Sequence, residues 1–278
     1  MKKLALVLAL VLCLSLASAA VAEEKTTYLL GVCGDYNEYW TPVIEALKAE
    51  GITLELVEFS SYPQPNRALA DKDIDLNAFQ HYKYLNSEVT SYGYDLTVVG
   101  DTIIAPLGLY SLKVKDVSEI KDGDTIAIPN DPSNGGRALK LLEAAGLITM
   151  DPAVGYLGEK GDIKENPLNI KIEEVDAAQL PSLLPDVTAA IINGGNALGY
   201  GYKLSDAIYV EKAVEGQDNP YINILVCRTE DKDNPLFKHI LDLLYTDEEA
   251  QFLYDTYGGT IIPAWKTTVT GPSAEAAK

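Results

Sequence analysis

The stretch NAFQHYKYL (77–85) gathers aromatic rings around one of the two histidines of the chain. Phe79 ends a predicted buried strand, DIDLNAF (73–79), and His81 and Tyr84 follow closely after it. In open α/β sheets ligands bind beyond the carboxyl ends of the strands, so this position favours one wall of a binding site. The residues alone leave two other interpretations open: His81 as a catalytic base, and the rings as ordinary core.

Further polar and aromatic side chains fall at the ends of other predicted strands. Tyr62 follows ITLELVEF in a proline-shaped loop, Asn193 lies in TAAIING, and Asn223 lies near the start of the strand YINILVCR. Arg137 lies in the first turn of a predicted helix, where the helix N-terminus and the guanidinium bind a carboxylate well, although a plain turn and cap is the alternative. One arginine, two amides and several rings suit a zwitterion with an apolar or thioether tail.

Signatures of catalysis and of metal binding are missing from the sequence. It contains no G-x-S-x-G, H-E-x-x-H, P-loop or strand-linked G-x-G-x-x-G, and no zinc-type cysteine spacing. A catalytic His81 needs an orienting acid and a nucleophile, and no serine or cysteine has that context. We therefore expect a protein that is not an enzyme and needs no cofactor; the alternative is an envelope enzyme acting on an amino-acid-like substrate, with His81 as base.

The first residues predict export. Lys2 and Lys3 precede an apolar run and the small residues ASAAVA, a pattern typical of a signal peptide over 1–22. We expect secretion across the inner membrane to the periplasm or cell surface, and Leu12 before Cys13 argues against a lipid anchor. The formal net charge of −19 excludes nucleic acid as a partner.

The two remaining cysteines, Cys33 and Cys227, lie far apart in the sequence and inside apolar runs. We expect both to be buried as small hydrophobic residues; a pair, or one reactive thiol, is the alternative.

Short β-branched runs alternate with helical patterns along the chain, which predicts an α/β fold with largely parallel sheets. No linker divides the sequence, and YINILVCR followed by two helices indicates a return to the N-terminal unit. We therefore expect two lobes with a ligand cleft between them. Lobe 1 is predicted over 23–108 and 224–278, and lobe 2 over 109–223, with crossovers near 106–111 and 221–224.

Long ordered segments of the chain resemble one family. They are LELVEFSSYPQPNRALADKDIDLNAFQHYKYL, GDTIAIPNDPSNGGRALKLLEAAGLI, ENPLNIKIEEVDAAQLPSLL, AAIINGGNALGYG and NPYINILVCRTEDKDNP. From Thr26 to Trp265 the chain is similar to the methionine-binding, MetQ/NlpA-type substrate-binding proteins of ABC importers.

The resemblance implies a two-lobed, type II-like periplasmic-binding-protein fold that closes on L-methionine or a related amino acid. It also implies a monomer that delivers this ligand to an ABC permease and its ATPase. Carried over by position, Arg137 pairs with the ligand carboxylate, and Asn193 and Asn223 bind the backbone atoms of the amino acid. The ligand side chain is then surrounded by Tyr62, Phe79, His81 and Tyr84.

Three segments depart from the family pattern. Ala105 precedes Pro106 where similar proteins have a tyrosine, which removes one ring from the expected pocket. The run CGDYNEYW replaces a glycine-rich polar run, so that Asp35, Tyr36 and Asn37 are candidates for extra contacts. After Asn193, NGGNALG replaces a segment that usually carries threonine.

Overall fold

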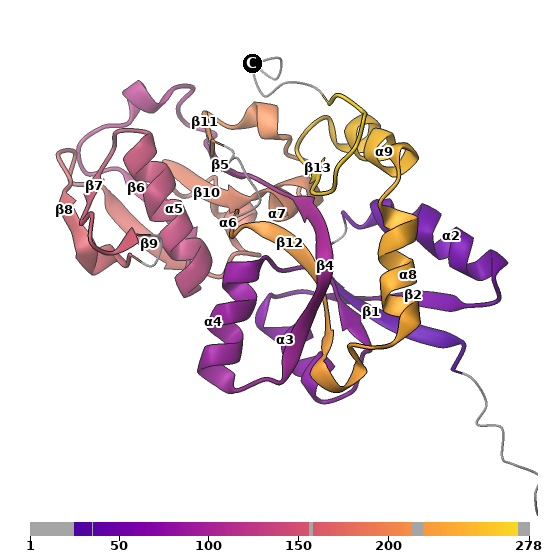
Figure 1. Ribbon diagram of the computed structural model, residues 1–278. Coiled ribbons are helices and arrows are strands. Elements are labelled where there is room, and N and C mark those ends of the chain that lie inside the picture. The colour runs from indigo at the N-terminus through magenta and orange to yellow at the C-terminus, as the bar shows by residue number, and fades with distance from the viewer. Residues whose placement is uncertain (1–24, 35, 156–157, 213–218, 272–278) are drawn as a thin grey trace, which may run out of the picture.

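The computed structural model of the protein describes residues 25–34, 36–155, 158–212 and 219–271, and its chain is built around two central sheets covered by helices (Figure 1). The expected signal peptide over 1–22 and Asp35 lie outside the described residues. Among the described residues, no helix is long and apolar enough to cross a membrane.

The first sheet is built from both ends of the chain and has the strand order β13-β4-β12-β3-β1-β2. β1 runs parallel to β2 and β3, whereas β12 is antiparallel to β3 and β4, and β13 is antiparallel to β4. Its strands are β1 (Thr27–Cys33), β2 (Thr53–Phe59), β3 (Leu76–Asn77), β4 (Leu96–Ile104), β12 (Ile222–Arg228) and β13 (Ile262–Pro263).

The second sheet comes from the middle of the chain and has the order β11-β5-β10-β6-β9. β6 is parallel to β9 and β10, and β5 is antiparallel to β10 and β11. Its strands are β5 (Leu107–Tyr110), β6 (Thr125–Pro129), β9 (Lys171–Val175), β10 (Ala189–Asn193) and β11 (Tyr209–Val210). A separate hairpin pairs β7 (Thr149–Met150) with β8 (Ile163–Glu165).

Two connections join the sheets. β4 leaves the first sheet and reaches β5 through Ala105 and Pro106, and β12 returns beside β4 in the opposite direction (Figure 1). An outgoing and a returning strand that lie side by side must run antiparallel. The prediction of largely parallel sheets is therefore wrong, because each sheet contains both parallel and antiparallel strand pairs.

Helices pack around each of the two sheets (Figure 1). Around the first sheet these are α2 (Thr41–Ala49), α3 (Pro63–Ala70), α4 (Tyr82–Tyr92), α8 (Pro235–Leu244) and α9 (Asp247–Tyr257). Around the second sheet they are α5 (Pro132–Ala144), α6 (Leu180–Leu183) and α7 (Gly194–Gly199). Short 3-10 turns are η1 (Glu38–Trp40), η2 (Val117–Glu119), η4 (Lys160–Asp162), η5 (Leu204–Asp206) and η6 (Thr229–Asp231).

The proline-rich segment after β2 is a helix rather than the expected loop. α3 begins at Pro63, and Tyr62 is its N-cap residue. Proline is well placed at the first helical position, because the N–H that it lacks would have no partner within the helix there. The correction matters for the site, because Tyr62 is held at a helix start and not in a free loop.

The core of the first lobe packs α2 and α8 against the sheet. Trp40 of η1 and Val43 and Leu47 of α2 are at most 1% exposed and lie in one cluster with Phe237 of α8. Cys227 belongs to this cluster. Both Cys33 and Cys227 are buried free thiols, which confirms the expectation that they act as small hydrophobic residues.

Candidate ligand-binding site

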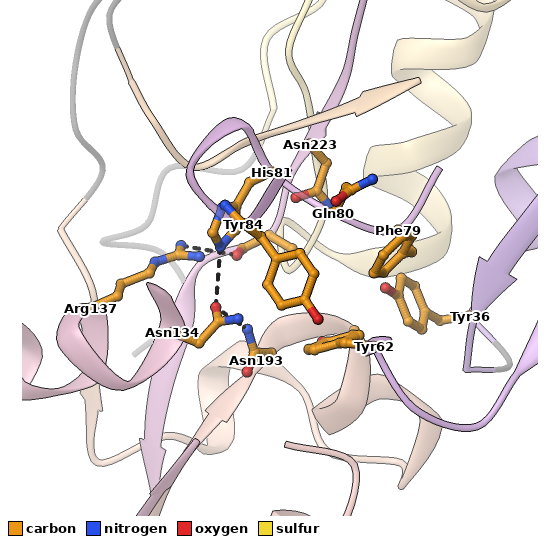
Figure 2. A pocket seen from close by; sticks show the side chains of 12 residues that line it. Tyr36, Tyr62, Phe79, Gln80, His81, Tyr84, Asn134, Arg137, Asn193 and Asn223 are labelled. Atoms are coloured by element: carbon orange, nitrogen blue, oxygen red, sulfur yellow. Dashed lines mark hydrogen bonds between the residues drawn. The ribbon is translucent and has the colours of Figure 1, made fainter. Parts of the chain in front are cut away.

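A cavity lies between the two lobes, at the carboxyl ends of strands from both sheets. It contains about 370 Å³ of space not filled by atoms, counting the space that opens to solvent. All seven residues expected at the site line this cavity, together with five others (Figure 2). The lining residues are Tyr36, Tyr62, Phe79, Gln80, His81, Tyr84, Ala105, Asn134, Arg137, Asn193, Gly195 and Asn223.

His81 is a structural hydrogen-bonding group in the neutral state. It is the N-cap of α4, and its Nδ1 accepts a hydrogen bond from the backbone N–H of Tyr84 at 3.1 Å. Nε2 therefore carries the proton and donates to Oδ1 of Asn134 at 3.2 Å. Burial, with the positive charge of Arg137 as a second cause, lowers the pKa of His81 to about 3. A histidine with both nitrogens engaged and this pKa is unsuited to act as a base.

Asn134 fixes the orientation of the amides around it. Its Nδ2 donates to both carboxylate oxygens of Asp131, at 3.1 and 3.0 Å, so its Oδ1 must be the atom that faces the cleft. That oxygen accepts from His81 and from Nδ2 of Asn193, the latter at 2.9 Å. Asn193 is thereby turned so that its own Oδ1, buried and without a partner among the described residues, is free to accept from a ligand.

Arg137 is held by a carboxylate of the protein. It is 3% exposed, and its Nε and Nη2 bond the two carboxylate oxygens of Glu211 at 2.7 and 2.5 Å. Nη2 also donates to the backbone oxygen of Ala105 at 3.3 Å, and the guanidinium carbon lies 4.2 Å from the centre of the Tyr221 ring. Glu211, at the end of the second sheet's edge strand, was not expected in this position. Among the described residues, the hydrogen bonds of Arg137 use Nε and Nη2 and leave Nη1 without a protein partner.

The far end of the cavity is an aromatic wall, which we define as Tyr62, Phe79 and Tyr84. Each ring of this wall touches the other two, with centroids 5.8 to 5.9 Å apart. The side chain of Cys33 packs behind Phe79 and Tyr84. Figure 2 shows Arg137 at the opposite end of the cavity from Phe79, so the site has one polar and one aromatic end.

A buried amide cluster supports the segment that carries Phe79 and His81. The side chain of Gln80 exchanges hydrogen bonds with Asn66 at 2.6 and 2.8 Å and donates to Asn77 at 2.9 Å. The backbone of His81 pairs with that of Asn223 as an isolated antiparallel bridge, which brings the first residues of β12 to the cavity. Asn223 thus reaches the site from the returning connection.

Three lining residues, Gln80, Asn134 and Gly195, were missed from the sequence. The sequence around Asn134 could have indicated its orientation. Asp131 is the N-cap of α5, and an asparagine three residues after the cap residue faces back towards it. Its role depends on His81 and Asn193, which come from distant parts of the chain. Tyr36, predicted only as a candidate for an extra contact, lines the cavity. Ala105 also lines it, at the position where a tyrosine is expected in similar proteins.

The two lobes touch on both sides of the cavity. The His81–Asn134 bond joins α4 to α5, and the Ser61 hydroxyl donates to Asp176 at 2.9 Å. These hydrogen bonds between the lobes indicate that the cleft is closed. A two-lobed α/β fold with a buried polar and aromatic site between its lobes defines a substrate-binding protein.

Comparison with known proteins gives the family. The model of the NlpA lipoprotein family matches residues 30–265, and the chain belongs to this family. It is 38% identical over 270 residues to the D-methionine-binding lipoprotein MetQ of Salmonella typhimurium, covering 95% of this chain and 98% of that protein.

Solved structures agree with this assignment. The chain superposes with a TM-score of 0.81 on a nutrient-binding protein from Burkholderia cenocepacia bound to methionine, at 38% identity, with 86% of this chain and 100% of that one covered. A TM-score of 0.81 is also found with the substrate-binding protein of a methionine transporter from Streptococcus pneumoniae, at 35% identity, with coverages of 86% and 96%. The predicted two-lobed binding-protein fold is thereby confirmed.

Proposed function

We propose that this protein captures methionine outside the cytoplasm and delivers it to the permease and ATPase of an ABC importer. The names of its relatives support each part of this function, since they include a D-methionine-binding lipoprotein, a protein bound to methionine and the substrate-binding protein of a methionine transporter. The relatives described as lipoproteins support a place at the periplasmic or outer face of a membrane.

The observation that carries the proposal is the polarity of the cavity. At its polar end the lining residue Arg137 is paired with Glu211, which lies outside the lining, and a neutral His81 lies beside Arg137. The charges of the pair offset each other, so this end suits a ligand whose own charges also cancel. Its aromatic end suits a thioether, because sulfur contacts ring edges favourably by about 0.3 to 1.5 kcal/mol. A zwitterion with a short thioether side chain meets both requirements.

The roles of the site residues follow from the available atoms. Nη1 of Arg137 is proposed to bond one carboxylate oxygen of the ligand, and Oδ1 of Asn193 to accept from its ammonium group. Asn223, able to donate and accept, is proposed to bind the remaining backbone atoms. The aromatic wall is proposed to surround the side chain, with the edge of His81 beside it.

The lobes are proposed to follow the two sheets, close to the predicted limits of 23–108 and 224–278 for one lobe and 109–223 for the other; each limit shifts by two residues, because β5 begins at Leu107 and β12 at Ile222. Support comes from strand membership, because β1 to β4 with β12 and β13 form one sheet and β5 to β11 supply the other sheet and the hairpin. A ligand that contacts both lobes binds the closed arrangement better than the open one and so shifts the population towards it.

A binding role is proposed in place of catalysis. The relatives are substrate-binding proteins. The ring nitrogens of His81 are both hydrogen-bonded, and its lowered pKa disfavours proton uptake near neutral pH. The alternative enzyme would lose turnover in His81→Ala while tolerating Asn223→Ala, whereas the proposed receptor loses binding in Asn223→Ala.

Mass spectrometry of the protein, purified natively and then denatured, tests the proposal without choosing a ligand in advance. We expect released methionine at close to one equivalent, with chiral chromatography giving its hand. Protein with Arg137→Ala, purified in parallel, should release none. Release of a different small molecule in stoichiometric amount from the unaltered protein would contradict the methionine assignment.

A further inference from the structure

Tyr36 of the first lobe rests directly on Gly195 of the second. A Cβ built on Gly195 would lie 2.1 Å from Cζ of Tyr36 and 2.3 Å from its hydroxyl oxygen. Such distances are far below van der Waals contact, so any larger residue at this position would displace the ring. Tyr36 is 7% exposed, which shows that the contact fills the space between the lobes.

The backbone before Tyr36 directs its ring to this place. Gly34 has φ +69°, a conformation that favours glycine, and its carbonyl accepts a hydrogen bond from the Asn37 amide at 2.6 Å. A Cβ on Gly34 would lie 3.1 Å from Cε1 of Tyr36. The ring is therefore packed between two glycines, one from each lobe.

A second cavity adjoins the ligand site and shares two lining residues with it. It encloses about 700 Å³, counting the space that opens to solvent, and is lined by Cys33, Gly34, Ser60, Ser61, Tyr62, Ala178, Gly195, Asn196, Gly199 and Tyr200. Tyr62 and Gly195 line both cavities, and Gly34 lines the second. The two spaces therefore share a wall at Tyr62 and Gly195, and Tyr36 packs on Gly195 from the side of the ligand site.

The lining of the second cavity is neutral. Its described residues include no lysine, arginine, aspartate or glutamate, and its polar groups are hydroxyls and amides. Nδ2 of Asn196 is buried and has no hydrogen-bond partner within the described part of the chain. This space suits an uncharged extension of a ligand side chain.

We propose that Tyr36, seated on Gly195, closes the aromatic end of the site and limits the length of the ligand side chain. Behind it, the second cavity is a latent subsite for neutral side chains longer than that of methionine. The proposal rests on the proposed function, because it places the thioether tail at the aromatic end. Figure 2 supports this placement, with Tyr36 beside Phe79 and Tyr62 and away from Arg137.

Calorimetric titration with a series of S-alkyl homocysteines tests the length limit. The ligands are methionine and its S-ethyl, S-propyl and S-butyl homologues, and the proteins are the unaltered chain, Tyr36→Ala and Tyr36→Phe. For the unaltered chain we expect affinity to fall about tenfold or more with each added methylene, as in a closed apolar pocket. Tyr36→Phe keeps the ring and should keep this fall. In Tyr36→Ala the fall should disappear, so that the S-butyl ligand binds at least as tightly as methionine.

A steep fall that persists in Tyr36→Ala would overturn the proposal, as would tight S-butyl binding by the unaltered chain. If Tyr36→Ala does not fold, Tyr36→Leu is read by the same criterion, with thermal unfolding of ligand-free protein as the check on folding. Gly195→Ala adds an independent test, since its loss of methionine affinity should be relieved by Tyr36→Ala in the double variant. Failure of the proposed function is distinct: the unaltered chain would then not bind methionine at all.

Discussion

His81 and Asn134 meet across the cleft, with Nε2 of the histidine 3.2 Å from Oδ1 of the amide. The first residue caps α4 in one lobe and the second lies in the first turn of α5 in the other. The same oxygen accepts from Asn193, so one buried amide both joins the lobes and orients a side chain that is proposed to bind the ligand. On this proposal, closure and ligand recognition are linked through Asn134.

Replacing Asn134 should weaken binding although the residue is proposed to make no direct bond to the ligand. Asn134→Ala leaves the donors of His81 and Asn193 without their acceptor, which costs about 1 to 3 kcal/mol for a buried group. We expect the dissociation constant for methionine to rise about 5- to 150-fold, measured by calorimetry. Asn169→Ala, which removes an exposed amide far from the cleft, serves as the control and should leave it unchanged. Unaltered affinity in Asn134→Ala would contradict the linkage.

The Arg137–Glu211 pair predicts that removing both charges restores the stability lost on removing Arg137 alone, without restoring methionine binding. Arg137→Ala leaves a largely buried carboxylate unpaired, which typically costs about 3 to 5 kcal/mol. The double variant Arg137→Ala/Glu211→Ala should recover much of this loss in denaturant unfolding, while methionine binding stays absent. Recovery of binding in the double variant would show that Arg137 does not bond the ligand.

The lowered pKa of His81 predicts a pH dependence of stability. Below pH 6.5 the unfolded chain takes up a proton on this histidine, whereas the native protein does not until about pH 3. Its contribution to the free energy of unfolding therefore falls as pH falls, by up to about 1.4 kcal/mol per unit. In denaturant unfolding of His81→Gln, the free energy of unfolding should therefore fall less steeply from pH 6.5 to 4.5 than in the unaltered protein. Equal slopes for the two proteins would indicate that His81 is not buried in the neutral form.

Glu249 predicts a dependence of the opposite sign. It is 5% exposed, one of its carboxylate oxygens has no partner among the described residues, and burial raises its pKa to about 7. The native state thus binds more protons than the unfolded state from about pH 4.5 to 7, and stability falls as pH rises through this range. Glu249→Gln should melt at a higher temperature than the unaltered protein at pH 8 and at a similar one at pH 5. A lower melting temperature at pH 8 would contradict this.

Local patterns predicted the elements well, and long-range relations much less so. The strands expected at ITLELVEF, TAAIING and YINILVCR form as β2, β10 and β12 to within one residue at each end, and the expected site residues at strand ends converge on one cavity. The direction of β12 was missed, because it depends on where the chain returns from and not on its own residues. Helix α3 could not be distinguished from a loop by its prolines, because proline is common both in loops and at the first position of a helix.

The site shows the same division. The rings of NAFQHYKYL were recognisable as a binding wall from their place after a strand. The part played by Asn134 and the contact of Tyr36 with Gly195 join residues about 50 and 160 positions apart, respectively, and no local pattern encodes them. Glu211 could not be assigned to Arg137 for the same reason.

Calorimetric titration of ligand-stripped protein with L- and D-methionine tests the central claim most directly. We predict saturable binding of at least one enantiomer with one site per chain, and its loss in both Arg137→Ala and Asn223→Ala, each checked for folding by thermal unfolding. Absence of heat with both enantiomers, or undiminished binding by both folded variants, would contradict the account.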